Sequence, residues 1–154
     1  IRDSHEHLFE YKTHMMQNYG AGVQACYRGP RLYDTPETQA AVTEVIQWYK
    51  KYRDILNSDM IHLRRPDARD WDGFIHVNPH KKEKGLAMFF NPAHQEITRT
   101  IHIPLYYTGL TQTARIREKE QKPVTYKLNR DYTVELTVKI PANGYTWYVV
   151  EAAD

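Results

Sequence analysis

The chain has 154 residues, and 21 Lys and Arg residues against 19 Asp and Glu residues give a formal net charge of +2. This balance, with no concentrated basic stretch, argues against a nucleic-acid-binding arm. No apolar run approaches the roughly 20 residues that a membrane span needs. Aromatic residues make up 12% of the chain, enough to anchor a core and too many for a disordered segment.

Large aromatic side chains are unusually frequent in this chain, which has twelve tyrosines and three tryptophans. Such rings suit half-buried sheet faces, domain interfaces and sugar-binding surfaces. The single cysteine, Cys26, excludes an internal disulfide, and its apolar surroundings predict a buried thiol rather than a nucleophile. Because the chain begins at Ile1 and not at Met, we expect a processed chain or a piece of a longer protein.

A first helix is predicted from Asp3, a capping residue, to Gly20, with apolar or long side chains at helical spacing between them. His5 and His7 stand two positions apart and therefore point to different sides of this helix. Adding His14 does not repair the geometry, so we expect no metal site.

Val23–Tyr27 is a short apolar run bounded by glycines, which predicts a short buried strand. Thr35-Pro36-Glu37 then marks the start of a second helix, with a cap, a proline and an acid in the first turn. This helix carries an apolar stripe of Val42, Val45, Ile46, Tyr49, Tyr52 and Leu56. Since the preceding helix can cover only part of the stripe, we expect the stripe to dock on protein outside these 154 residues.

From Asp59 onward the apolar residues recur at every second position instead of at helical spacing, most clearly over Tyr132–Ile140. Further strands are predicted at 60–64, 74–77, 86–90, 97–105, 113–117, 124–128 and 145–150. About eight short strands separated by turn signals predict an antiparallel sandwich. The expected fold class is α+β, a helix–strand–helix segment over 1–57 followed by an all-β sandwich over 58–154.

A dense mixed-charge stretch surrounds Trp71 and comprises Arg64, Arg65, Asp67, Arg69, Asp70 and Asp72. We expect ion pairs here, because the arginines are natural partners of the acids and the calcium-loop pattern is missing. Calcium held by the carboxylates and a sugar contact at Trp71 are the alternatives. Lys81–Lys84 is interpreted as a solvated turn.

Three stretches resemble the melibiase-type α-galactosidases. Trp48–Leu56 is similar to their final barrel helix, Gly85–Pro92 to a sandwich strand that enters an asparagine turn, and Lys139–Val150 to their closing strands. From about residue 15 to residue 153, the chain resembles the C-terminal part of a retaining glycoside hydrolase. In that family the end of a (β/α)8 barrel leads into an antiparallel sandwich.

The resemblance implies that 1–57 form the terminal β-α portion of the barrel and that the sandwich of 58–154 packs on and stabilises it. In the family, the two catalytic carboxylates lie on upstream barrel strands. We therefore assign no catalytic residue and expect this chain alone to lack glycosidase activity. No cofactor is expected, and a periplasmic or extracellular location is favoured.

Tyr27, Arg28 and Arg31 directly follow the short predicted strand. Active-site groups of a barrel come from the loops at the carboxyl ends of its strands, so we expect these residues at the rim of a substrate cleft. An ordinary surface loop, with the arginines capping the barrel or pairing with Asp34, is the alternative.

Two other functions remain open, a free-standing carbohydrate-binding or adhesion module and a structural interaction domain. The helical first third argues against the binding module, because a simple binding sandwich has no use for an apolar helix stripe. The expected partners are the rest of the enzyme and a carbohydrate, and neither nucleic acid nor a membrane is expected.

Overall fold

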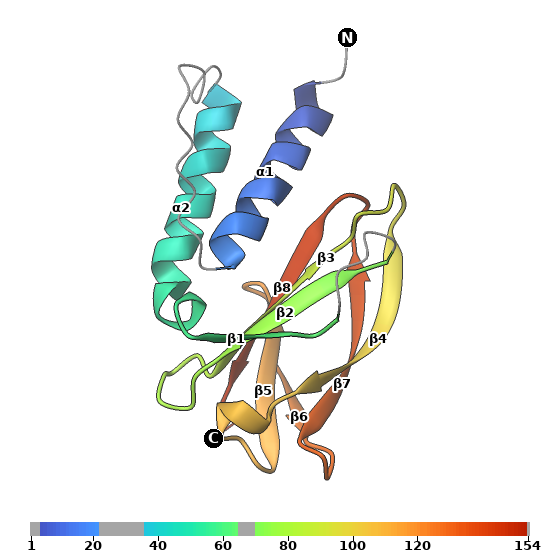
Figure 1. Cartoon of the computed structure of the whole chain (residues 1–154). Coiled ribbons are helices and arrows are strands. Elements are labelled where there is room, and N and C mark those ends of the chain that lie inside the picture. The colour runs from blue at the N-terminus through green and yellow to red at the C-terminus, as the bar shows by residue number, and fades with distance from the viewer. Residues whose placement is uncertain (1–3, 22–35, 65–69, 154) are drawn as a thin grey trace.

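The computed structural model describes residues 4–21, 36–64 and 70–153. Within these residues two α-helices, α1 (Ser4–Gly20) and α2 (Pro36–Leu56), precede the strands (Figure 1). The strands are β1 (Asp59–His62), β2 (Asp72–Val77), β3 (Gly85–Phe90), β4 (Ile97–Pro104), β5 (Thr113–Glu118), β6 (Val124–Lys127), β7 (Thr133–Ile140) and β8 (Tyr145–Glu151). Within the described residues this is the expected α+β fold with eight strands. The short strand predicted at 23–27, with Cys26, lies outside them.

The strands form two antiparallel sheets. The larger has the order β1-β2-β3-β8-β5-β6, and the smaller pairs β4 with β7. The central strands β3 and β8 are paired from Gly85 opposite Val150 to Phe90 opposite Tyr145. They come from distant parts of the chain, so the centre of the larger sheet is built by long-range pairing.

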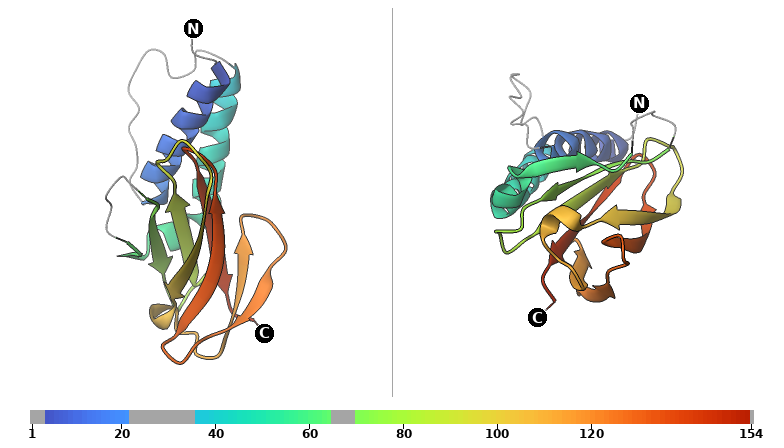
Figure 2. Two further views of the ribbon diagram at one scale, coloured as in Figure 1. Left: turned by 90° about the vertical axis from the view of Figure 1, so that its right-hand side faces the viewer. Right: turned by 60° about the horizontal axis from the view of Figure 1, so that its bottom comes forward.

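The molecule has three layers, which the views of Figure 2 separate: the helix pair, the larger sheet and the smaller sheet. Side chains of β3 alternate between the two sides, with Leu86, Met88 and Phe90 toward the helices and Ala87 and Phe89 toward the other sheet. Every residue of this strand is buried. Because both faces are covered, β3 is apolar throughout, whereas β7 at the outside alternates buried and exposed residues.

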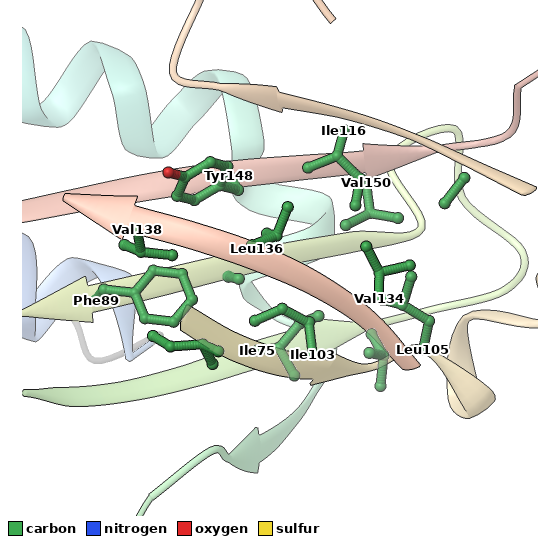
Figure 3. Close-up of a cluster of buried hydrophobic side chains, with 14 of the residues drawn as sticks. Ile75, Phe89, Ile103, Leu105, Ile116, Val134, Leu136, Val138, Tyr148 and Val150 are labelled. Atoms are coloured by element: carbon green, nitrogen blue, oxygen red, sulfur yellow. The ribbon is translucent and has the colours of Figure 1, made fainter. Parts of the chain in front are cut away.

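One core fills the space between the two sheets (Figure 3). Its larger members are fully or almost fully buried and are contributed by both layers, namely Ile75, Phe89, Ile103, Leu105, Ile116, Val134, Leu136, Val138, Tyr148 and Val150. The alternation predicted for 132–140 places its apolar residues in this core, which confirms the sandwich.

A second core joins the helices to the outer face of the larger sheet. Met15 and Met16 of α1 and the stripe of α2 pack against Phe74, Leu86, Met88, Phe90, Trp147 and Val149. Val42, Val45, Tyr49, Tyr52 and Leu56 are all at most 7% exposed, and Ile46 is partly buried at the margin of this core. The prediction that this stripe docks on protein outside the chain is therefore wrong. The larger sheet offers a second apolar face, and that face covers the stripe.

The carboxyl end of α1 lies directly on the sheet. A Cβ atom added at Gly20 would stand 2.2 Å from the sulfur of Met88, which is itself fully buried. Glycine at this position therefore allows the close approach as well as ending the helix.

Neither described helix has the length and apolar character needed to cross a membrane.

Asn91 holds the corner where the chain passes from the larger to the smaller sheet. Its side-chain nitrogen donates to the carbonyl oxygen of Gln95 at 2.8 Å and lies 3.1 Å from that of Pro141, and its side-chain oxygen accepts from the N–H of Ala93 at 2.9 Å. Asn91 is 2% exposed, so these bonds satisfy a buried amide and tie two turns together. The asparagine turn expected after 85–90 is thus a structural corner of the sandwich.

Candidate functional site

The predicted cleft residues Tyr27, Arg28 and Arg31 lie outside the described residues. The segment that contains them leads into α2, whose amino-terminal end projects beyond the sandwich (Figure 2). Their placement at a substrate cleft stays a prediction.

The half-buried side chain of Trp71 packs against the core of the sandwich. Its ring packs at 5.8 Å between centroids against Phe89, and the guanidinium of Arg64 stands 5.8 Å from the ring centre. The carboxylate of Asp70 pairs with Arg64 at 3.0 Å and with Arg99 of β4 at 3.2 Å. The predicted ion pairing is confirmed for Arg64 and Asp70, whereas 65–69 lie outside the described residues. A sugar contact at Trp71 stays a prediction.

The ion pairs at Asp70 hold its carboxyl in the charged form. Partial burial acts to raise the pKa, but the N–H of Trp71 and the guanidinium groups of Arg99 and Arg64 outweigh it and lower the pKa below its ordinary value. Asp70 therefore fastens the loop before β2 to β4 of the other sheet.

A cluster of three large rings occupies the centre of the helix–sheet interface. Tyr52 of α2 packs edge to face with Trp147 of β8 at 5.1 Å, and Trp48 lies 5.6 Å from Trp147 and 6.0 Å from Tyr52. Rings in such tilted contact gain more than their buried area alone provides. This part of the tyrosine and tryptophan excess therefore serves to join helix and sheet.

At the margin of this ring cluster, the hydroxyl of Tyr52 enters a polar network. It donates a short hydrogen bond to Glu120 and accepts one from Arg117 at 3.0 Å, while Lys51 donates to the same Glu120 oxygen at 2.9 Å. We call Tyr52, Arg117, Glu120 and Lys51 the Tyr52 network. It connects α2 with β5 and the turn after it.

The electrostatics of the Tyr52 network keep the proton on the phenol. Burial and the hydrogen bond to Glu120 raise the pKa of Tyr52 well above its ordinary value. Burial acts to raise the pKa of Glu120 too, but the hydrogen bonds from Tyr52 and Lys51 outweigh it and lower that pKa. A phenol that keeps its proton donates a hydrogen bond, so the network anchors α2 to β5 and the turn after it.

A buried histidine forms a second anchor. His76 of β2 is 1% exposed, with Nε2 2.5 Å from the carbonyl oxygen of Gly20 and Nδ1 3.2 Å from that of Ser58. One contact reaches the end of α1 and the other the turn after α2. Both partners are backbone carbonyl oxygens, so this one ring joins the end of α1 and the turn after α2 to β2.

Neither anchor could be predicted from the local sequence. Tyr52 belongs to the predicted apolar stripe, but its partners Arg117 and Glu120 stand 65 and 68 positions further along the chain. His76 lies within the predicted strand 74–77, and no spacing pattern indicates its partners. The only local signal was the polar histidine inside the otherwise apolar run Phe74–Val77, which marks a buried polar group in need of partners.

An open hollow of about 600 Å³ lies beside the turn after α2 and the hairpin between β2 and β3. Its lining is mostly polar and comprises Asp54, Asn57, Ser58, Asp59, Val77, Asn78, Pro79, His80 and Lys81. No group of three or more His, Cys, Asp or Glu side chains with the arrangement of a metal site occurs in the described parts of the chain.

No protein-family model matches the sequence, and no curated protein matches it significantly. The fold is similar to that of solved glycoside hydrolases. α-Galactosidase I from Mortierella vinacea matches over 95% of this chain and 36% of its own, with a TM-score of 0.62 and 14% identity. A GH27 β-L-arabinopyranosidase from Geobacillus stearothermophilus, solved in complex with arabinose, matches over 96% of this chain and 31% of its own. Its TM-score is 0.62 and its identity 13%.

These matches define the class of fold: two helices and an antiparallel β-sandwich that α-galactosidase-type glycoside hydrolases also contain. The resemblance inferred from the sequence is confirmed at this level. The chain spans about a third of the length of these two enzymes.

Proposed function

We propose that this chain is the C-terminal part of a glycoside hydrolase of the α-galactosidase type. Residues 1–57 belong to the end of its catalytic (β/α)8 barrel, and the sandwich packs on and stabilises that barrel. One observation carries the proposal: the similarity covers 95–96% of this chain, so the helix pair and the sandwich match together. A free-standing sugar-binding sandwich is not favoured, because it has no need of the helix pair.

The helix–sheet core provides the physical means of stabilisation. If α2 is the last barrel helix, then the sandwich covers the side of that helix which carries Val45 and Tyr52, both almost fully buried. Each large apolar side chain removed from water contributes roughly 1.5–3 kcal/mol. The Tyr52 network and His76 add hydrogen bonds that fix the orientation of the helices on the sheet.

The chemistry of the whole enzyme then needs two carboxyl groups, one as acid and one as nucleophile, on the remaining barrel strands. Tyr27, Arg28 and Arg31 are proposed for the rim of the cleft. Arginine at such a position donates paired hydrogen bonds to sugar hydroxyls or keeps a catalytic carboxylate charged.

The activity is tested with the full-length protein on an aryl α-D-galactoside and an aryl β-L-arabinopyranoside. We expect hydrolysis of at least one of them. Absence of turnover with both substrates, in a folded protein, would overturn the proposed function.

The cleft is tested with Arg28→Ala, for which we expect kcat/KM to fall at least tenfold, equivalent to about 1.4 kcal/mol of transition-state binding. Arg53→Ala, on the exposed side of α2, is the matched control and should keep the wild-type value. Full activity in both Arg28→Ala and Arg31→Ala would mean that this loop is structural.

A further inference from the structure

Two neighbouring tyrosines stand out from the surface of the sandwich. Tyr106 and Tyr107 are 62% and 64% exposed, the highest values among the large hydrophobic side chains of the described residues. They lie on the short 3-10 helix η1 (Tyr106–Thr108), between β4 and β5. Neither ring belongs to one of the two hydrophobic cores, and neither takes part in the Tyr52 network.

The backbone that carries the two rings is firmly held. Thr108 is fully buried, and its hydroxyl donates to the carbonyl of Leu105 at 2.5 Å and accepts from the N–H of Leu110 at 3.2 Å. Gly109 ends η1 in the left-handed conformation with φ 80, and a Cβ atom added there would stand 3.1 Å from the Cβ of Pro79. A ligand would therefore meet rings on an ordered turn, and little backbone entropy would be lost on binding.

The rings form a corner. Tyr106 and Tyr107 stand at 89° with centroids 5.1 Å apart, and Tyr106 is held from behind by Tyr132 at 5.4 Å and 73°. Because the two rings are perpendicular, a ligand in the corner would meet the face of one ring and the edge of the other. Such a corner offers an apolar plane together with phenol hydroxyls that donate and accept hydrogen bonds.

The surroundings favour a small polar ring ligand over a protein surface. A protein partner needs an apolar centre within an interface of about 800 Å² on each side. Leu105 and Thr108 beside the tyrosines are buried, and Leu110 is half-buried. Gly109 is exposed but carries no side chain, and Thr111, Gln112 and Asp131 are exposed and polar. A pyranose ring has one apolar C–H face and a rim of hydroxyls, which matches an aromatic plane with polar neighbours.

We propose that the corner formed by Tyr106 and Tyr107 is a second carbohydrate-binding site, which holds a neutral polysaccharide away from the catalytic cleft. The choice of a polysaccharide rests on the proposed function. In a (β/α)8 barrel the helices begin at the face that carries the active site. η1 lies at the end of the molecule opposite the amino-terminal end of α2 (Figure 1). The site therefore tethers a long chain and does not contact the bond that is cut.

The test is native affinity electrophoresis of the full-length protein in gels that contain galactomannan or arabinogalactan. We expect at least one polysaccharide to retard the wild-type protein. The Tyr106→Ala/Tyr107→Ala variant should raise the apparent Kd at least tenfold, whereas the Tyr106→Phe/Tyr107→Phe variant keeps the ring faces and stays retarded. Val124→Ala, a change of a 54% exposed side chain on β6, is the matched control and should migrate like wild type.

Because both rings are exposed, the double alanine variant should keep the wild-type Tm. If its Tm falls, Tyr107→Ala alone decides the question, since the ring contact described with Tyr132 belongs to Tyr106. Unchanged migration of wild type in both gels, or equal retardation of the alanine variants, would overturn the inference. So would an effect of the alanine variants on self-association alone.

Aryl glycoside hydrolysis by the wild-type protein separates this inference from the proposed function. An inactive protein whose retardation depends on the tyrosines would remove the proposed function and keep the second site. An active protein whose retardation does not depend on them would do the reverse.

Discussion

At the scale of single residues, Tyr52 joins two kinds of packing in one side chain. Its ring lies 1% exposed between Trp48 and Trp147, and its hydroxyl reaches Arg117 and Glu120. A substitution that removes only the hydroxyl therefore measures what the polar network contributes to stability, separately from the packing of the ring.

For Tyr52→Phe we expect the free energy of unfolding to fall by about 1–2 kcal/mol, because two charged groups lose a buried partner while the ring stays in place. Urea denaturation measures the change. Tyr107→Phe, which alters an exposed hydroxyl, should leave the stability within about 0.5 kcal/mol of wild type. A Tyr52→Phe protein as stable as wild type would show that the network contributes no net stability.

Asp70 makes part of the stability depend on pH. Its pKa is lower in the folded protein than the value of about 3.9 in an unfolded chain. Its ion pairs therefore stabilise the fold above that pH, and the contribution is lost as the pH falls below it.

We expect Asp70→Asn to lower the free energy of unfolding by about 0.5–1 kcal/mol at about pH 6 and by less at about pH 3. Arg99→Ala should remove part of the same pH dependence, since Arg99 is one of the two arginines paired with Asp70. A difference between Asp70→Asn and wild type that stays constant from pH 6 to pH 3 would contradict this assignment.

At the scale of elements, α2 is held by its apolar stripe on a sheet of the same chain. Val45 is fully buried in this core, which also contains Met88 and Trp147 of the sheet. A charge at that position would have no partner in the apolar interface.

Val45→Asp should lower the free energy of unfolding by at least about 3 kcal/mol, the usual cost of an unpaired buried charge. Gln47→Asp, on the exposed side of the same helix, is the control and should stay within about 0.5 kcal/mol of wild type. Thermal unfolding of both variants distinguishes the two sides of α2. Equal Tm values would mean that α2 does not pack on the sheet as described.

The elements themselves could be predicted with good accuracy. α2 ends at Leu56 and β1 begins at Asp59, where the apolar period changes from that of a helix to two. β7 spans Thr133–Ile140, within the alternating stretch, and the turn before β8 contains Asn143 with φ 51, a conformation that asparagine tolerates. Periodicity and turn residues act over a few positions, so they are visible in the sequence.

At the scale of the whole molecule, the helix pair covers an apolar sheet face that would otherwise meet water. That face carries six large apolar side chains: Phe74, Leu86, Met88, Phe90, Trp147 and Val149. Contiguous apolar patches of this size are rare on soluble monomers.

A shortened chain that begins at residue 58 should therefore bind the dye ANS strongly and self-associate in sedimentation experiments. The 154-residue chain, in which the helices cover the face, is the control and should do neither to the same extent. A shortened chain that stays monomeric and does not bind ANS would instead support a free-standing sandwich module.

The sequence by itself determined the α+β class and, in the residues that the structure describes, the eight strands and the two helices, because these depend on local spacing and turn chemistry. It also carried the resemblance to α-galactosidases that the fold comparison confirms. Only the tertiary structure decided which surface covers the α2 stripe and which partners Tyr52 and His76 find. The hydrogen bonds of Tyr52 and His76 join residues 18 to 68 positions apart, and no local pattern encodes which of several apolar faces will meet.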